Sequence, residues 1–125
     1  MILDPQHTYI HLAADGVAQQ VSSEAFWQLP APAFAAFGQG WLISEYAFSA
    51  DWPSWEMHPH GDEFVYLLSG AVELQLEQGG ELVKVALEGS GAVLVPRGVW
   101  HTAKVRMPSR MLHVTRGGGT ETRPV

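Results

Sequence analysis

Glycine and proline interrupt this chain so frequently that long regular helices are not expected. The sequence holds 13 glycines and 8 prolines among 125 residues. The segments between them are short, rich in aromatic and β-branched side chains, and mostly alternate with period two, which is typical of half-buried strands. We therefore predict an all-β protein, with strands at 41–49, 54–58, 63–69, 71–77, 81–87, 92–95, 100–106 and 110–115.

The connections between these strands are too short for parallel pairing. Gly70 and the pair Gly79–Gly80 predict tight turns. No segment between strands is long enough for the helical crossover that parallel strands require. Many short antiparallel strands in one chain are typical of a sandwich or a barrel, so we expect one of these two architectures.

The N-terminal part has a different character. Asp15-Gly16 lies between two alternating segments and predicts a short hairpin. Ser22 or Ser23 could cap a brief helix, which Pro30 and Pro32 would limit to about one turn.

These features divide the chain into three parts. Residues 1–40 are expected to form the hairpin and a loop from 31 to 40, packed on a barrel of residues 41–116. Residues 117–125 begin with a glycine run and are expected to form an extended tail.

Composition excludes several classes of function. Without cysteine the chain has no disulfide, no thiolate zinc site and no thiol nucleophile. A net charge of -6 with only two lysines opposes binding to nucleic acid, whose phosphates attract clustered basic side chains. No apolar run approaches the roughly 18 residues of a membrane span. We expect a cytoplasmic protein.

Chemistry-bearing residues gather in two short stretches, 55–63 and 96–101. They hold three of the six histidines and three carboxylates. On a strand, Glu56 and His58 share one face, and a turn at residues 59–62 would bring Glu63 onto the neighbouring strand beside them. Imidazole nitrogen and carboxylate oxygen together suit a divalent Fe, Mn, Ni or Zn ion, whereas calcium requires more oxygen ligands.

The same stretches resemble the two-part signature of the cupins. Six residues separate Glu63 from Gly70, as in the first cupin motif, and Pro96-x-Gly98-x-x-His101 matches the second. The resemblance covers residues 55–106. It implies a small antiparallel jelly-roll barrel that holds a divalent metal, with dioxygenase, isomerase or lyase activity on a small oxygenated metabolite.

The first motif departs from the family pattern, and two registers can be drawn. In one, the loop is shortened and His58, His60 and Glu63 are metal ligands. In the other, Glu56 replaces the first histidine, and the usual four residues separate His58 from Glu63. We prefer the second register because it keeps the family spacing. Both registers share His58, Glu63 and His101, with Glu56 as the fourth ligand and His60 as the alternative.

A non-catalytic function is the second hypothesis. Some cupins have lost their metal, so the same histidines could be hydrogen-bonded residues of a metal-free barrel. Such a barrel would bind or sense a small anion, sugar or metabolite.

Alternation along residues 63–68 assigns the two faces of that strand. If Glu63 faces inward, Val65 and Leu67 line the pocket, together with His113 from the last predicted strand. The outward face is then also apolar, with Phe64, Tyr66 and Leu68. Such a face requires a cover, so we expect a homodimer or an N-terminal segment packed over it.

Overall fold

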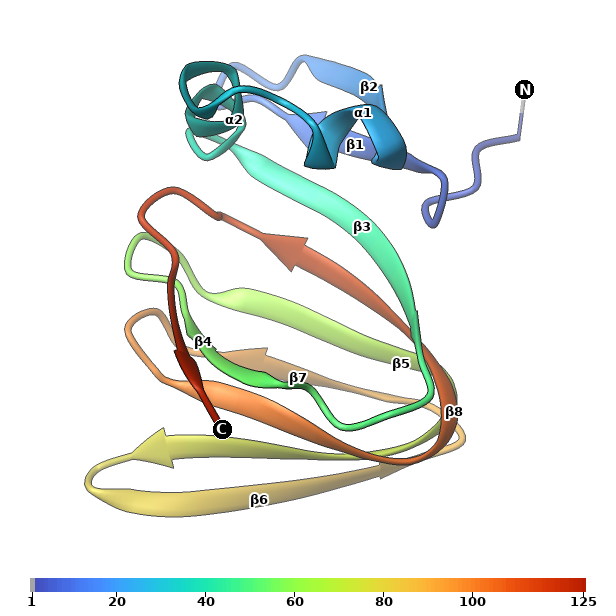
Figure 1. The fold of residues 1–125 in the computed structure, drawn as a ribbon, viewed down its shortest axis with the longest axis vertical. Helices are drawn as coiled ribbons and strands as arrows, with labels where there is room; N and C mark the ends of the chain where they lie inside the picture. Colours follow the sequence, from blue (N-terminus) through green and yellow to red (C-terminus); the bar gives the residue numbers. More distant parts are fainter. Residues whose placement is uncertain (1) are drawn as a thin grey trace.

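The computed structural model describes residues 2–125, which form nine β-strands and two short helices (Figure 1). In chain order these are β1 (Thr8–Leu12), β2 (Ala18–Ser22), α1 (Ser23–Trp27), α2 (Ala31–Phe37), β3 (Trp41–Phe48), β4 (Ser54–Met57), β5 (Glu63–Gln78), β6 (Glu81–Glu88), β7 (Gly91–Val95), β8 (His101–Thr115) and β9 (Glu121–Pro124). The predicted all-β class is confirmed.

Two long strands, β5 and β8, organise the sheet. They pair with each other, and every pairing among the described strands is antiparallel. β8 also pairs with β3 and β4, while β5 also pairs with β6 and β7. In Figure 1 both long strands bend sharply, so that each contributes to two opposed layers. The space between these layers holds the hydrophobic core.

The prediction of a tight turn at Gly70 was wrong. β5 continues through Gly70, which has a φ of 100° and lies where the pairing of β5 with β8 shifts register. Ser109 of β8 accepts a hydrogen bond from the backbone N–H of Ala71 at this point. Gly70 therefore marks an irregularity at which a single strand bends, and irregularities of this kind bend strands without ending them. The predicted strands 100–106 and 110–115 are likewise one strand, β8.

The expected loop from residue 31 was also wrong, because Ala31–Phe37 form a helix. Pro30 is the N-cap residue and Pro32 lies in the first turn. The first turn is the part of a helix in which proline is tolerated, since its missing N–H would have no partner there. The predicted hairpin and the brief helix capped by Ser22 are both present, as β1–β2 and α1.

The core follows the alternation along β5 and β8. Glu63 faces inward with the fully buried residues at 65, 67, 72 and 74, and β8 adds Ala103 and Met111, the register partners of Leu74 and Leu67. Removing each large apolar side chain from water stabilises the fold by roughly 1.5–3 kcal/mol.

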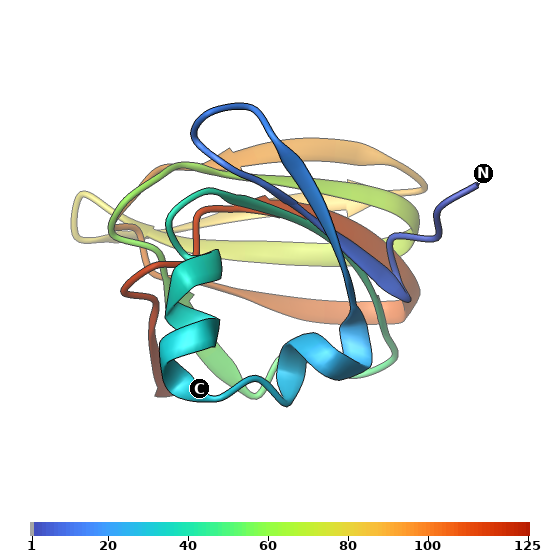
Figure 2. The same cartoon turned by 90° about the horizontal axis from the view of Figure 1, so that it is seen from above.

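The N-terminal helices lie together at one end of the molecule (Figure 2). The ring centroid of Phe26 on α1 lies 5.5 Å from that of Tyr9 on β1. At the C-terminal end of α2, a Cβ atom on Gly38 would lie 2.6 Å from the Cα atom of Gly118. The absence of a side chain at Gly38 thus lets α2 pack directly on the glycine run after β8. Within residues 2–125, no helix is long and apolar enough to cross a membrane.

Substitution of Gly70 tests whether the bend in β5 requires glycine. A Cβ at this position would approach Oγ of Ser109 to 2.2 Å and the carbonyl oxygen of Pro108 to 2.5 Å. Backbone strain and steric overlap together should make Gly70→Ala lower the free energy of unfolding by about 3 kcal/mol or more, measured by urea denaturation. Gly79→Ala is the matched control, because Gly79 also has a positive φ but has no neighbour within 4 Å of its added Cβ. It should cost only about 1–2 kcal/mol. Equal losses in the two variants would contradict this account of Gly70.

Candidate metal centre

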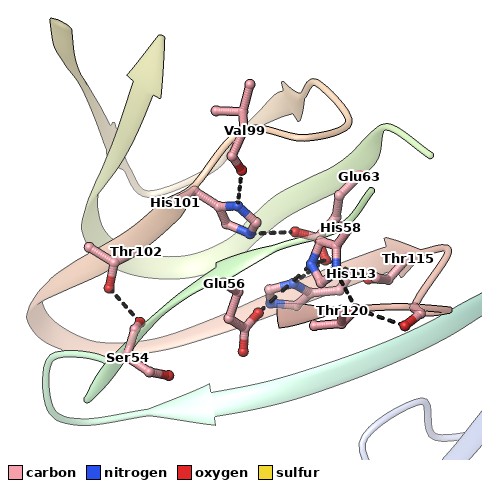
Figure 3. A network of polar contacts seen from close by, with 11 residues as sticks. Ser54, Glu56, His58, Glu63, Val99, His101, Thr102, His113, Thr115 and Thr120 are labelled. Carbon is pink, nitrogen blue, oxygen red and sulfur yellow. Dashed lines mark hydrogen bonds and ion pairs between the residues drawn. The ribbon is translucent and has the colours of Figure 1, made fainter. Parts of the chain in front are cut away.

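Three strands bring the predicted site residues together at one end of the core (Figure 3). Glu56 on β4 is the direct register partner of His101 on β8, and His58 follows β4 by one residue. One ligand atom from each of Glu56, His58 and His101 lies within 4.8 Å of the other two. Glu63, the first residue of β5, lies between the histidines. Its Oε1 atom is 3.1 Å from Nε2 of His101 and its Oε2 atom is 3.4 Å from Nε2 of His58.

The carboxylate of Glu63 is buried, since this residue is only 3% exposed. Burial by itself would raise the pKa of Glu63, but the contacts with His101, His113 and His58 outweigh burial and hold the pKa well below its usual range. The hydroxyl of Thr115 also donates a hydrogen bond to Oε2. Glu63 is therefore a charged oxygen donor with a fixed orientation.

The hydrogen bonds of His58 define which of its ring nitrogens carries the proton. Thr120 donates its only hydroxyl proton to the carbonyl oxygen of Gly117, over a distance of 2.7 Å. The same hydroxyl oxygen lies 2.7 Å from Nδ1 of His58, so it must accept a hydrogen bond from that nitrogen. Nε2 of His58 is then the ring nitrogen that faces Glu63.

His101 is oriented by the same logic. Its Nδ1 atom lies 3.1 Å from the carbonyl oxygen of Val99, which can only accept a hydrogen bond. Nδ1 is therefore the donor, and Nε2 faces Glu63. Hydrogen bonding of one ring nitrogen to a carbonyl or hydroxyl group is the usual way in which proteins orient histidines that bind metals.

The converging atoms lack hydrogen-bond partners. Nε2 of His58, Nε2 of His101 and Oε1 of Glu63 are all buried, and none makes a directed hydrogen bond. Leaving several buried polar atoms unpaired is costly, and such atoms are rare in native structures. Two imidazole nitrogens and a carboxylate oxygen that face one another could together bind a cation. The donor set is thus compatible with a divalent metal ion.

Of the remaining predicted residues, only His113 contacts the cluster. His60 is exposed in the loop after β4, beside Gly119, and is not part of the cluster. Val65 and Leu67 are fully buried in the core on the strand that begins with Glu63. His113 on β8 is buried, with Nδ1 at 3.6 Å from Oε2 of Glu63.

Sequence analysis missed the two threonines of the site. Thr115 ends β8, and Thr120 lies in the segment that had been expected to be a plain tail. Neither belongs to a recognisable motif. Thr120 is 62 residues from His58 along the chain, so only the return of β9 along β4 reveals their contact.

A large cavity adjoins the cluster. Its volume is about 1170 Å³, and Glu56, His58, Glu63 and His113 line one part of it. Residues of α1 and α2 line another part. The cluster therefore lies in the wall of a cavity that can hold a small molecule beside it.

Several solved structures share this fold. A cupin-2 domain protein of Shewanella frigidimarina has a TM-score of 0.52 and 13% identity, over 60% of this chain and 69% of that chain. A cupin superfamily protein of Desulfitobacterium hafniense has a TM-score of 0.52 and 21% identity, over 60% and 65%. Fe(II)-HppE bound to an alternative substrate has a TM-score of 0.51 and 15% identity, over 60% and 42%. At these identities the likeness shows the fold alone.

Sequence comparison identifies the family. No curated protein matches this chain significantly. The family model of the cupin domain matches residues 44–115, which is more than half of the chain and includes both predicted motifs from Glu56 to His101. This protein therefore belongs to the cupin domain family.

Proposed function

We propose that this cupin binds a divalent metal ion between His58, His101, Glu63 and Glu56, and acts on a small oxygenated metabolite in the adjoining cavity. The observation that carries the proposal is the convergence of two buried Nε2 atoms, neither with a hydrogen-bond partner, on a buried carboxylate. The reaction would be of the dioxygenase, isomerase or lyase type. A bound metal would supply a Lewis acid or a site for dioxygen.

The mixture of donors favours Fe(II) or Mn(II). Two imidazoles and one carboxylate form the set associated with non-haem iron, and a second carboxylate from Glu56 would balance the charge of the divalent ion. The similar structure of HppE contains Fe(II), as its name states. The protein's own groups would orient the ligands, through Thr120 behind His58 and Thr115 behind Glu63.

Glu56 is proposed as the fourth ligand in preference to His60. Oε2 of Glu56 lies 3.8 Å from Nε2 of His58, and its side chain is 37% exposed. This partial exposure would leave the carboxylate free to move toward a metal. His60 lies outside the cluster, in the loop.

A metal-free binding barrel is the second candidate function, and one contact favours it. Burial alone would lower the pKa of His101, but the adjacent, negatively charged carboxylate of Glu63 raises it. A proton on Nε2 of His101 would then compensate Glu63 without a metal. In this case the barrel would bind a small metabolite without catalysis. We further propose that the protein is cytoplasmic.

Two substitutions distinguish the two candidate fourth ligands. Glu56→Gln removes a charged oxygen and should lower the affinity for Fe(II) or Mn(II) by about tenfold or more, whereas His60→Ala should change it little. His58→Ala and His101→Ala should each weaken binding more strongly. Anaerobic calorimetric titration of the apo protein measures all four variants. The shortened-loop register would be correct if the effects of Glu56→Gln and His60→Ala were exchanged.

The same titration decides between the metal-dependent and metal-free candidates. Elemental analysis of protein purified without a histidine tag or chelator should find stoichiometric metal. If the wild type binds none of Fe(II), Mn(II), Ni(II) and Zn(II) with a dissociation constant below about 1 mM, which corresponds to roughly -4 kcal/mol, the metalloenzyme proposal fails.

The second prediction concerns the role of Thr120 as a positioning residue. Thr120→Val keeps the shape of the side chain but removes the acceptor of the His58 Nδ1 proton, so metal affinity should fall by about 10- to 100-fold. Long-range ¹H–¹⁵N NMR spectra of the apo variant should also show that His58 no longer prefers the Nδ1–H form. Thr8→Val, at a residue of β1 that does not line the cavity, should leave both readouts unchanged. An unaltered His58 tautomer in Thr120→Val would contradict the assigned role.

We further propose that this protein is a homodimer. One apolar row crosses five strands on the outer face of the sheet, through successive register partners: Ile10, Ile43, Val114, Phe64 and Leu94. Leu94 is 66% exposed. A continuous apolar row of this kind on a sheet favours a protein partner, and a second copy of the chain is the partner we propose.

The third prediction tests this interface. In analytical ultracentrifugation at micromolar concentration, the wild type should sediment at twice the chain mass. Leu94→Glu places a charge in the row and should give a monomer. Leu82→Glu, at a residue that is 48% exposed but outside the row, should remain dimeric. A monomeric wild type at high concentration would refute the homodimer.

A further inference from the structure

The cavity beside the metal cluster has an aromatic wall contributed by the N-terminal helices. Its barrel side includes Tyr46, Phe48 and Trp52. Its helix side includes four aromatic side chains, which we call the helix wall: Phe26, Trp27, Phe34 and Phe37. The volume of about 1170 Å³ is at the upper end for ligand pockets. A cavity this large between two aromatic surfaces favours a flat, apolar ligand body.

Two members of the helix wall are exposed although they are large and aromatic. Trp27 is 58% exposed and Phe34 is 41% exposed, and their ring centroids lie 6.2 Å apart. The indole N–H of Trp27 donates a hydrogen bond to the hydroxyl of Tyr9, which fixes the ring. Burying exposed aromatic rings under a ligand ring lowers the free energy of the complex. Contact between two aromatic rings stabilises the complex further than the buried area alone would.

Arg116 adds a positive charge to this cavity. It is the only lysine or arginine among the cavity-lining residues of the described chain. Its Nε atom is buried without a hydrogen-bond partner. No carboxylate within residues 2–125 forms an ion pair with it. An unpaired, partly buried guanidinium is costly, so an anionic partner at this position would be stabilising.

The stem of Arg116 is held in place by Gly61. A Cβ atom on Gly61 would lie 2.9 Å from Cβ of Arg116 and 2.9 Å from the ring of Trp41. The absence of a side chain at Gly61 therefore lets the turn before Glu63 pack directly against the arginine stem. A guanidinium on a packed stem loses little further conformational freedom when it binds a carboxylate.

We propose that the cavity selects an aromatic carboxylate, whose ring packs on the helix wall and whose carboxylate pairs with Arg116. The helices would thereby determine specificity, and the metal cluster would contact the remainder of the ligand. The statement that this ligand is the substrate rests on the proposed function. Binding itself depends on the cavity and Arg116.

The experiment compares three probes on metal-free protein by calorimetry. The first, 2-naphthoate, has both the ring and the charge. The second, 2-naphthamide, keeps the ring without the charge, and hexanoate keeps the charge without the ring. The expected result is that 2-naphthoate binds at least tenfold more tightly than either of the others. Equal affinity for the naphthoate and the amide, or for the naphthoate and hexanoate, would overturn the proposal.

Matched variants assign the two contributions. Arg116→Gln should remove the preference for 2-naphthoate over 2-naphthamide while leaving the affinity for the amide unchanged, which also shows that the variant is folded. Trp27→Ala and Phe34→Ala should weaken both naphthyl probes by a similar factor. Arg97→Gln is the control, since Arg97 is exposed and does not line the cavity. A preference that survives in Arg116→Gln would overturn the role of Arg116.

Failure of this inference can be distinguished from failure of the proposed function. Wild-type protein that binds Fe(II) or Mn(II) but discriminates among none of the probes would refute the aromatic carboxylate and leave the metal site standing. Protein that binds 2-naphthoate selectively but takes up no metal would support the inference and favour the metal-free barrel.

Discussion

Glu63 is charged and buried inside the barrel, so side chains from several distant parts of the chain must stabilise its carboxylate. Isolated burial of a carboxylate costs several kcal/mol, and this cost falls only when donors or cations surround the group. His58 reaches it from the end of β4, and His101, His113 and Thr115 all reach it from β8. Because β5 carries Glu63 and pairs with β8 over almost its whole length, the main pairing of the fold also assembles the site.

The segment from Arg116 to Thr120 connects this site to the N-terminal part of the molecule. Thr120 holds His58 at one end of the segment, and Arg116 lies against Gly61 at the other. Between them, Gly118 packs on Gly38 after α2. One short, glycine-rich segment thus contacts the candidate metal ligand His58, the turn before Glu63 and the C-terminal end of α2. Its position is set by β9, which pairs with β4.

Much of the fold could be predicted from local patterns. Period-two alternation located the strands, and Asp15-Gly16 indicated the N-terminal hairpin, since both signals depend on neighbouring residues alone. The errors arose where distant contacts override local preference. Gly70 was read as a turn, but β8 lies alongside it and β5 continues as one bent strand. Residues 31–37 were read as a loop, but proline is compatible with the first turn of α2.

The sequence by itself determined which residue types were available to the site. The cupin motifs brought Glu56, His58, Glu63 and His101 to attention because their spacing follows strand and turn geometry. Only the tertiary structure decided which ring nitrogens face Glu63, since Thr120 and Val99 accept hydrogen bonds from the two Nδ1 atoms. It also decided what faces the site. The helix wall and Arg116 are far apart in the sequence, and both line the cavity. Local sequence patterns carry no signal for this arrangement.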